Sequence, residues 1–235
     1  HGARATATNF FTGSLQHGVG THDPYVTGYA FILWLHVPKW LSNVAEFKAL
    51  SQKNFKSFSG LQNIQLETEG LRGGFTVNEL HYAKSIGAKP TEFNLKFQAH
   101  SGAPMERLYN EWVSGIRDPK TGVALYPKKA GIPYHSANHT GTLLYVVTRP
   151  DADNFEGKNI EHASLWTHVE PKTIHLEHYN FESGNHDFSE LEQTFSGQFH
   201  FGEEVEAFAA SYVAQRIYPF YTENAFNNLA SYTAE

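Results

Sequence analysis

The residues between Thr91 and Gly122 constrain the fold more than any other part of this sequence. Phe93, Leu95 and Phe97 alternate with polar residues, which is the period-two pattern of a strand that buries one face and leaves the other in water. The pattern therefore predicts a half-buried strand, and we expect its three aromatic and aliphatic side chains to pack in the core.

A helix is predicted directly after this strand. Ser101 can cap it, and Pro104 falls in the first turn, where the missing backbone N–H does no harm. Apolar residues then recur at the spacing of one helical face: Met105, Leu108, Trp112 and Ile116. We expect this face to pack on a sheet, and we expect the segment DPKTG at 118–122 to form the tight turn that ends the unit.

The composition favours mainly β structure. The chain has 235 residues, which is enough for one large domain whose core needs neither disulfides nor metals. Its 18 Phe and 12 Tyr residues favour strands over helical bundles. Cysteine is absent, so disulfides, thiolate metal sites and a cysteine nucleophile are excluded.

Further elements are predicted from the same periodicities. Strands are expected at 28–37, 61–69, 75–82, 143–147, 165–169, 174–176 and 195–201. The first of these is apolar on both faces, so a central place in a sheet is expected for it. Helices are expected from Asn43 to Phe58 and from Glu203 to Ile217. A long projecting hairpin is expected with its loop at 83–90 and with the strand at 91–98 as its returning limb.

These elements divide the chain into three parts. An N-terminal arm is expected at 1–27, because that stretch is small, polar and rich in glycine. A β domain is expected at 28–202, with insertions at 38–60 and 123–139. A C-terminal helical extension is expected at 203–235.

The charge and hydropathy of the chain limit the classes of partner that we expect it to bind. A net charge of −6 argues against tight nucleic-acid binding, because affinity for phosphates comes largely from Lys and Arg. No apolar run approaches the roughly 18–20 residues of a membrane span, so membrane insertion is not expected. Residues 1–20 contain nothing that resembles a secretory signal.

The sequence contains no recognised catalytic motif. HExxH, GxSxG, GxxxxGK[ST] and GxGxxG are all absent. His175 and His178 would face opposite sides of an expected strand, and Glu67 and Glu69 share a face but fit a solvated surface better than a glycosidase cleft. We expect a protein that is not an enzyme and needs no cofactor. The 14 histidines leave a metal-dependent β-barrel enzyme open as the alternative from another class.

The order of the elements resembles that of a known protein family. An early strand (GYAFILWLHV), a strand leading into a projecting hairpin (FTVNELHYAKSIGAKPTEFNLKFQ) and a helix (MERLYNEWVSGIRDP) come first. A buried strand (TGTLLYVV), a strand with a proline corner (ASLWTHVEPKTI) and an aromatic strand (LEQTFSGQFHF) follow. Over roughly residues 28–202 this order is similar to the tail tube proteins of contractile-tailed bacteriophages, and to structural proteins of large-genome phages in particular.

The resemblance implies a β-sandwich or small barrel that closes into hexameric rings, and rings that stack into a hollow tube. Its inner wall would be built by the segments 61–69, 75–82, 91–98 and 191–201. The residues expected to face this lumen are Glu67, Glu69, Glu92, Asn94, Lys96, Glu192 and Gln198. The hairpin residues expected to contact neighbouring subunits or rings are Phe75, Val77, Leu80, Tyr82, Ile86 and Lys89. The residues expected to pack in the core are Phe93, Leu95, Phe97, Leu108, Trp112 and Phe199.

The resemblance also implies the partners. These would be other copies of the chain, tail sheath subunits, a baseplate hub, a tail terminator and DNA that passes through the lumen without specific binding. The net charge of −6, together with Glu67, Glu69 and Glu192 among the lumen candidates, suggests an acidic lumen, which would repel DNA phosphates and let the genome slide. The expected location is the virion, after assembly in the host cytoplasm. A tube initiator, tube terminator or baseplate adaptor of the same fold is the alternative within this class.

Overall fold

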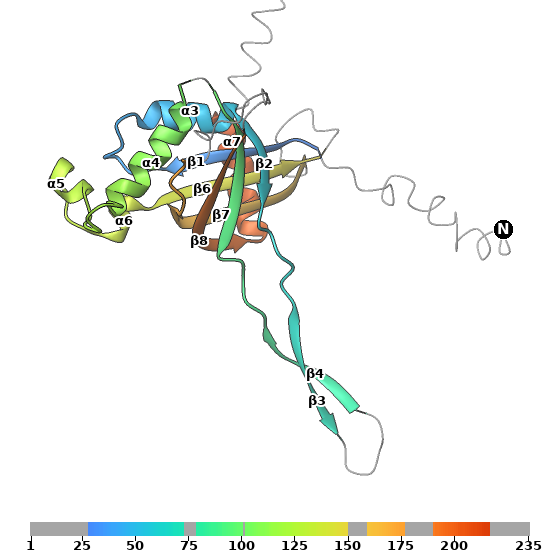
Figure 1. Ribbon diagram of the computed structural model, residues 1–235. Helices are drawn as coiled ribbons and strands as arrows, with labels where there is room; N and C mark the ends of the chain where they lie inside the picture. The colour runs from blue at the N-terminus through green and yellow to red at the C-terminus, as the bar shows by residue number, and fades with distance from the viewer. Residues whose placement is uncertain (1–27, 73–78, 101, 150–158, 177–189, 217–235) are drawn as a thin grey trace, which may run out of the picture.

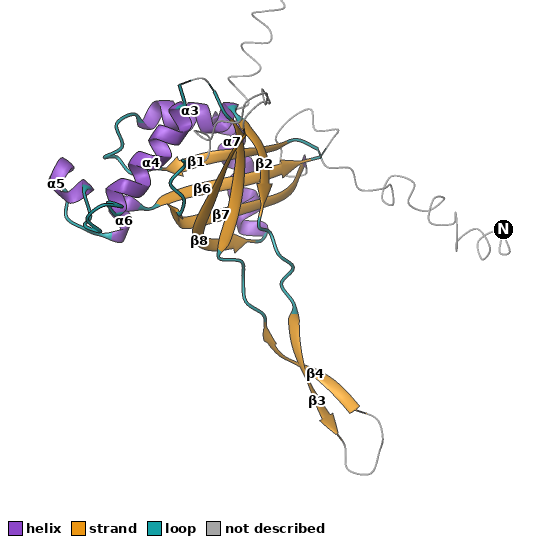
Figure 2. Ribbon diagram, in the orientation of Figure 1, coloured by secondary structure: helices purple, strands orange, loops and turns teal. Residues whose placement is uncertain are grey.

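The computed structural model describes residues 28–72, 79–100, 102–149, 159–176 and 190–216 (Figure 1). The described chain is mainly β, as predicted, with a curled antiparallel sheet and several helices (Figure 2). The strands are β1 Ala30–His36, β2 Phe55–Ser59, β3 Leu66–Arg72, β4 Glu79–Ile86, β5 Glu92–Gln98, β6 Gly141–Thr148, β7 Ile160–Pro171 and β8 Glu190–Phe201. The helices are α3 Val44–Lys53, α4 Pro104–Ile116, α5 Tyr126–Ala130, α6 Ser136–His139 and α7 Glu203–Arg216.

Six of the strands form one sheet in the order β1-β6-β7-β8-β5-β2, and every neighbouring pair is antiparallel. The sheet curls so far that its two edge strands, β1 and β2, approach each other. β1 is therefore an edge strand, not the central strand that its sequence predicts. It is apolar on both faces because Trp34 points into the curl while Leu33 lies on the outer face, in the cluster that α7 completes.

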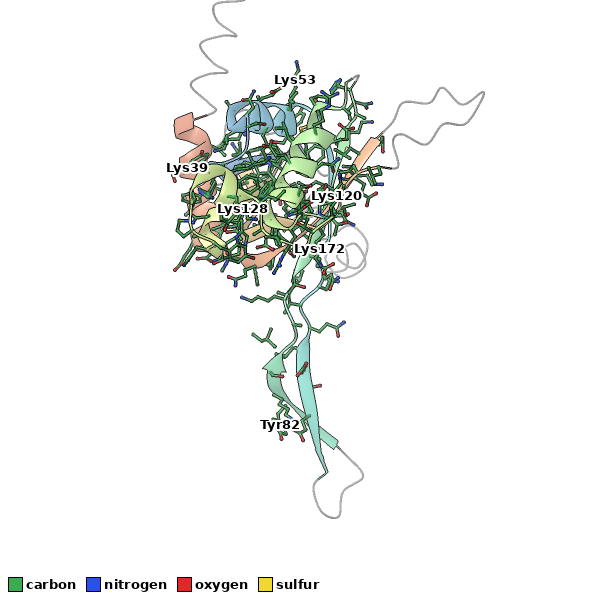
Figure 3. All side chains as sticks on the ribbon, turned by 60° about the vertical axis from the view of Figure 1, so that its left-hand side comes forward. Lys39, Lys53, Tyr82, Lys120, Lys128 and Lys172 are labelled. Carbon is green, nitrogen blue, oxygen red and sulfur yellow. The ribbon has the colours of Figure 1, made fainter. Side chains whose placement is uncertain are left out.

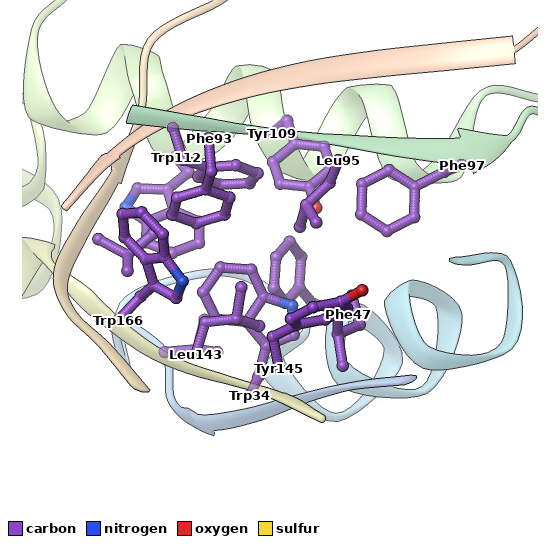
Figure 4. Packing of buried hydrophobic residues seen from close by; sticks show 14 of the residues in the cluster. Trp34, Phe47, Phe93, Leu95, Phe97, Tyr109, Trp112, Leu143, Tyr145 and Trp166 are labelled. Carbon is purple, nitrogen blue, oxygen red and sulfur yellow. The ribbon is translucent and has the colours of Figure 1, made fainter. Parts of the chain in front are cut away.

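The interior of the curl holds one aromatic core (Figure 4). α3 and α4 cover its open side, and they contribute Phe47 and Trp112, whose rings lie 5.6 Å apart. The indole Nε1 of Trp112 donates a hydrogen bond to the backbone oxygen of His139 at 2.8 Å. The six residues expected in the core are all buried in this cluster: Phe93, Leu95, Phe97, Leu108, Trp112 and Phe199.

A smaller apolar layer covers part of the outer surface of the sheet. Leu144 and Val146 of β6 point outward, where they pack with Ala209 and Val213 of α7. The predicted C-terminal helix begins at Glu203 as expected, and three glutamates occupy its first turn. Hence α7 is a packed part of the body over its described length.

Several local predictions differ from the structure. The helix expected to reach Phe58 ends at Lys53, and Phe55–Ser59 instead forms β2, which pairs with β5. The segment 38–60, expected as an insertion, thus supplies both a helix and a sheet edge. Ala103 occupies the N-cap position of α4 without a side-chain hydrogen bond, and Ser101, the expected cap, lies outside the described residues. Residues 174–176, expected as a strand, have no regular structure.

Gly115 on α4 offers a direct test of this packing. A Cβ atom built on Gly115 would lie 2.1 Å from the indole ring of Trp40, and that ring is held by a hydrogen bond from its Nε1 to the backbone oxygen of Asn138. We expect Gly115→Ala to lower the free energy of unfolding by about 1–3 kcal/mol, because the indole must move out of its packed position. Urea denaturation measures this change. The neighbouring substitution Ser114→Ala is the control, and equal stabilities of the two variants would contradict the prediction.

Candidate assembly surfaces

The outer face of β5 and β8 is polar along its length. In this antiparallel pair Glu92 lies opposite Ser196, Asn94 opposite Thr194, and Lys96 opposite Glu192. Directly opposed residues share a face, and the intervening residues of β5 point into the core. Five of the expected lumen residues therefore lie together on this face, which we term the polar wall: Glu92, Asn94, Lys96, Glu192 and Gln198.

Among the described residues, three ion pairs cross the polar wall: Lys96–Glu192, Lys56–Glu190 and Lys172–Glu92. Lys56 Nζ lies 2.7 Å from Glu190 Oε1, and this hydrogen bond holds the pKa of the Glu190 carboxyl below its ordinary value. Each of the three carboxylates is thus matched by a lysine. The sequence predicts an acidic wall, but the charges on this face balance because β2 and the chain after β7 bring in Lys56 and Lys172, which the strand patterns do not reveal.

The remaining two expected lumen residues, Glu67 and Glu69, lie elsewhere. They belong to β3, which pairs with β4 alone in a separate two-stranded ribbon. Glu67 accepts a hydrogen bond from Ser85, and Glu69 Oε2 lies 3.0 Å from Lys84 Nζ. The expected four-segment wall is therefore two structures, a body face made by β5 and β8 and a ribbon made by β3 and β4.

The ribbon projects away from the body (Figure 1). Its two limbs are β3 and β4, and the chain between them, residues 73–78, lies outside the described residues. The sequence predicts a hairpin loop at 83–90, but residues 79–86 are strand, and only the linker 87–91 joins the ribbon to β5. The error arises because period-two patterns fix which residues form strands and not where the chain turns.

Apolar side chains are exposed where the ribbon meets the body. Leu66 and Ile86 face each other across the ribbon, and they are 60% and 70% exposed. Next to them lies an open groove of about 540 Å³, whose apolar lining includes Leu61, Ile64, Phe199 and Phe201. Exposed apolar residues gathered in this way mark interaction surfaces more often than isolated ones do.

The expected hairpin residues are distributed as follows. Tyr82 and Ile86 lie on β4 with exposed side chains, and Leu80 belongs to the same strand. Lys89 lies in the linker, with its ammonium 5.7 Å from the centre of the Phe201 ring. Phe75 and Val77 lie outside the described residues.

One further surface, a lobe that contains two short helices, was not predicted from the sequence as an ordered structure. The segment 123–139, predicted as a surface excursion, carries α5 and α6 around the buried Tyr126. The Tyr126 ring stacks on Trp40 at 5.2 Å, and its hydroxyl lies 3.2 Å from Nδ1 of His139. His139 Nε2 in turn lies 2.9 Å from Glu170 Oε1. These contacts fix the lobe against the end of the sheet.

The histidines do not gather into a metal site in the described part of the chain, where no group of three His, Asp, Glu or Cys side chains could hold an ion. His139 contacts Glu170 and Tyr126, and His175 contacts Gln193 through its Nε2. Among the described helices, none is long and apolar enough to cross a membrane.

Comparisons with known proteins give matches at the level of structure only. No protein-family model matches the sequence, and no curated protein sequence matches it. A chain of the sheath–tube complex of an extracellular contractile injection system (PVC) aligns with a TM-score of 0.43 and 11% identity, covering 79% of this chain and 96% of the other.

Two further matches come from the anti-feeding prophage (AFP). A chain of its baseplate aligns with a TM-score of 0.41 and 10% identity, covering 77% of this chain and 97% of the other. A chain of its tube-terminating cap aligns with a TM-score of 0.40 and 13% identity, covering 78% and 99%.

Proposed function

We propose that this protein is a non-enzymatic structural subunit that assembles with copies of itself into stacked rings, forming the tube of a contractile-tail-type particle. The main observation that supports this proposal is the ribbon formed by β3 and β4. A two-stranded hairpin alone is at best marginally stable in water, yet this one stands clear of the body and leaves Leu66 and Ile86 exposed. A neighbouring copy that covers its base would bury this surface and remove the open strand edges.

The contact made by such a ribbon is heterologous, because the ribbon of one copy meets a different surface of the next. Contacts of this type close into rings when the rotation between copies permits it, and otherwise they extend into helical filaments. Six copies in each ring, with the ribbon reaching the adjacent ring, is the arrangement that the family resemblance suggests.

In this assembly the polar wall faces the lumen. The outer surface at α7 is already covered by a helix, whereas no described helix covers the outer face of β5 and β8, which is polar and crossed by ion pairs. Such a face suits a water-filled channel. With its charges balanced, it offers DNA phosphates no basic track to bind, so passing DNA would be neither held nor strongly repelled.

Other components would complete the particle. The proposed partners are sheath subunits around the tube, a baseplate hub and a tail terminator, in a phage virion assembled in its host's cytoplasm or in a related injection particle. A tube cap or baseplate adaptor of the same fold is the second form of the proposal, and it differs in stopping at a single ring.

The absence of cysteine makes the lumen assignment testable. Asn94→Cys places a unique thiol on the polar wall, and Ser211→Cys places one on the exposed side of α7. In assembled protein, we expect the thiol at 94 to react with a small maleimide but not with a maleimide carrying a 5-kDa polymer, a size on the order of a small domain. The thiol at 211 should react with both reagents.

Mass spectrometry of the labelled chains measures the result. Both thiols should react with both reagents once the assembly is dissociated, which controls for local burial. Polymer labelling at position 94 in intact tubes, as fast as at position 211, would contradict the lumen assignment.

A further inference from the structure

The helical lobe carries a concentration of positive charge in an otherwise acidic chain. Residues 37–41 and 115–140 contain a single carboxylate, that of Asp118, against five exposed cations. These five cations form what we term the basic lobe: Lys39, Arg117, Lys120, Lys128 and Lys129. Figure 3 turns this side of the molecule forward, and Lys39, Lys120 and Lys128 are labelled there.

These cations are not neutralised within the described part of the chain. Asp118 is engaged locally, because its carboxylate accepts hydrogen bonds from the Thr121 hydroxyl at 2.6 Å and from the backbone N–H of Lys120 at 3.2 Å. None of the ion pairs found among the described residues includes a member of the basic lobe. The stack of Trp40 on Tyr126 holds the lobe in place, so its charges are presented on a fixed surface.

A complementary surface exists on another face of the same chain. The first turn of α7 holds Glu203, Glu204 and Glu206. Their negative charges outweigh the partial positive charge, about half an elementary charge, at the N-terminus of a helix, so this turn is acidic. Between this turn and the outer face of β7 and β8 lies an open hollow of about 490 Å³. Glu203 and Glu204 line it beside the apolar side chains of Leu165 and Val205, and we term it the acidic hollow.

We propose that the basic lobe of one copy docks on the acidic hollow of the next copy in the ring. Lysine side chains lay apolar stems along apolar surface and keep the ammonium group free, so Lys128 or Lys129 fits a hollow with an apolar floor and carboxylates at its rim. The two patches lie on different faces of one chain, which makes the contact head-to-tail and leaves each patch available to a neighbour. The inference rests on the proposed self-assembly and specifies its lateral contact.

Charge reversal on each side of the contact tests it. Lys128→Glu with Lys129→Glu replaces the two adjacent lysines of the lobe by carboxylates, and Glu203→Lys with Glu204→Lys replaces two carboxylates of the hollow by ammonium groups. We expect each variant alone to self-associate at least about tenfold more weakly than the wild type, because like charges then meet. An equimolar mixture of the two variants, and a single chain carrying all four changes, should both recover, since opposite charges meet again.

Sedimentation velocity at fixed protein concentration and ionic strength measures the association. Arg107→Glu with Lys53→Glu is the matched control, because it makes the same charge change as the lobe variant at exposed positions outside the lobe. Circular dichroism checks that every variant is folded. The control should associate like the wild type.

The possible outcomes distinguish the proposed self-assembly from the proposed contact between the basic lobe and the acidic hollow. Wild-type protein that stays monomeric overturns both the assembly and this contact. Wild-type protein that assembles, with reversed variants that assemble equally well, overturns the contact alone. A lobe variant that fails without recovery in the mixture also overturns it, because the lobe would then contact a surface of the neighbouring copy other than the acidic hollow.

Discussion

Replacing Trp112 by alanine should lower the free energy of unfolding by about 3–5 kcal/mol. Trp112 is fully buried, and its ring contacts those of Trp34 and Phe47 at centroid distances of 5.7 and 5.6 Å. The substitution opens a cavity where α4 meets the sheet. It also removes the donor to the backbone oxygen of His139, so that a buried acceptor loses its partner.

Urea denaturation followed by far-ultraviolet circular dichroism measures this loss without depending on the fluorescence of the deleted indole. Arg107→Ala on the same helix is the control, because that side chain is exposed and its removal should change the stability by less than about 0.5 kcal/mol. A Trp112→Ala variant within about 1 kcal/mol of the wild type would show that α4 is not essential to the core.

Replacing both Leu66 and Ile86 by lysine should abolish self-assembly while leaving the subunit folded. Both side chains are more than half exposed in the single chain, so their loss costs the monomer little. In the proposed assembly they are buried against a neighbour, where two lysines would have to be desolvated without a partner. We expect the association constant to fall by about 1,000-fold, the effect of two hot-spot residues of about 2 kcal/mol each at about 1.4 kcal/mol per factor of ten.

Sedimentation velocity measures the association, and thermal melting tests whether the variant is folded. The matched control is Tyr29→Lys with Leu176→Lys, two large side chains that are 70% and 66% exposed and belong neither to the ribbon nor to the lining of the groove at its base. The ribbon variant should remain monomeric while the control assembles. Equal assembly of the two variants would mean that the ribbon base is not the interface.

The sequence predicts elements well where local pattern and tertiary contact agree. β5 and α4 form where the alternation of Phe93 to Phe97 and the helical spacing around Trp112 place them, because each has a single buried face. α7 begins at its predicted glutamates for the same reason. The core residues read from these patterns are accordingly buried.

The sequence fails where a distant partner decides the structure. Phe55 and Phe58 continue the apolar spacing of α3, yet they form a strand because β5 offers an open edge and the Tyr145 ring stacks on Phe58 at 4.2 Å. β1 has the pattern of a central strand because α7, more than 160 residues later, helps to cover its outer face. Neither partner is visible in the local sequence.

For the assembly surfaces, too, the local sequence predicts some features, and distant segments decide the others. Alternation along β5 and β8 places five lumen candidates on one face, but Lys56 and Lys172, which balance their charge, come from segments with no period-two pattern. Glu67 and Glu69 alternate in the same way as Glu92 and Asn94, although they belong to a separate ribbon. The Lys128–Lys129 dipeptide was the available signal for the basic lobe, and the contact of Trp40 with Tyr126 is what gives it a fixed position.

Electron microscopy of the purified full-length chain, negatively stained over a range of concentrations, tests the central claim most directly. We predict stacked rings or hollow tubes whose number grows with concentration. Single rings that do not stack would select the cap or adaptor form of the proposal. Separate monomers at every concentration up to the limit of solubility would contradict the account.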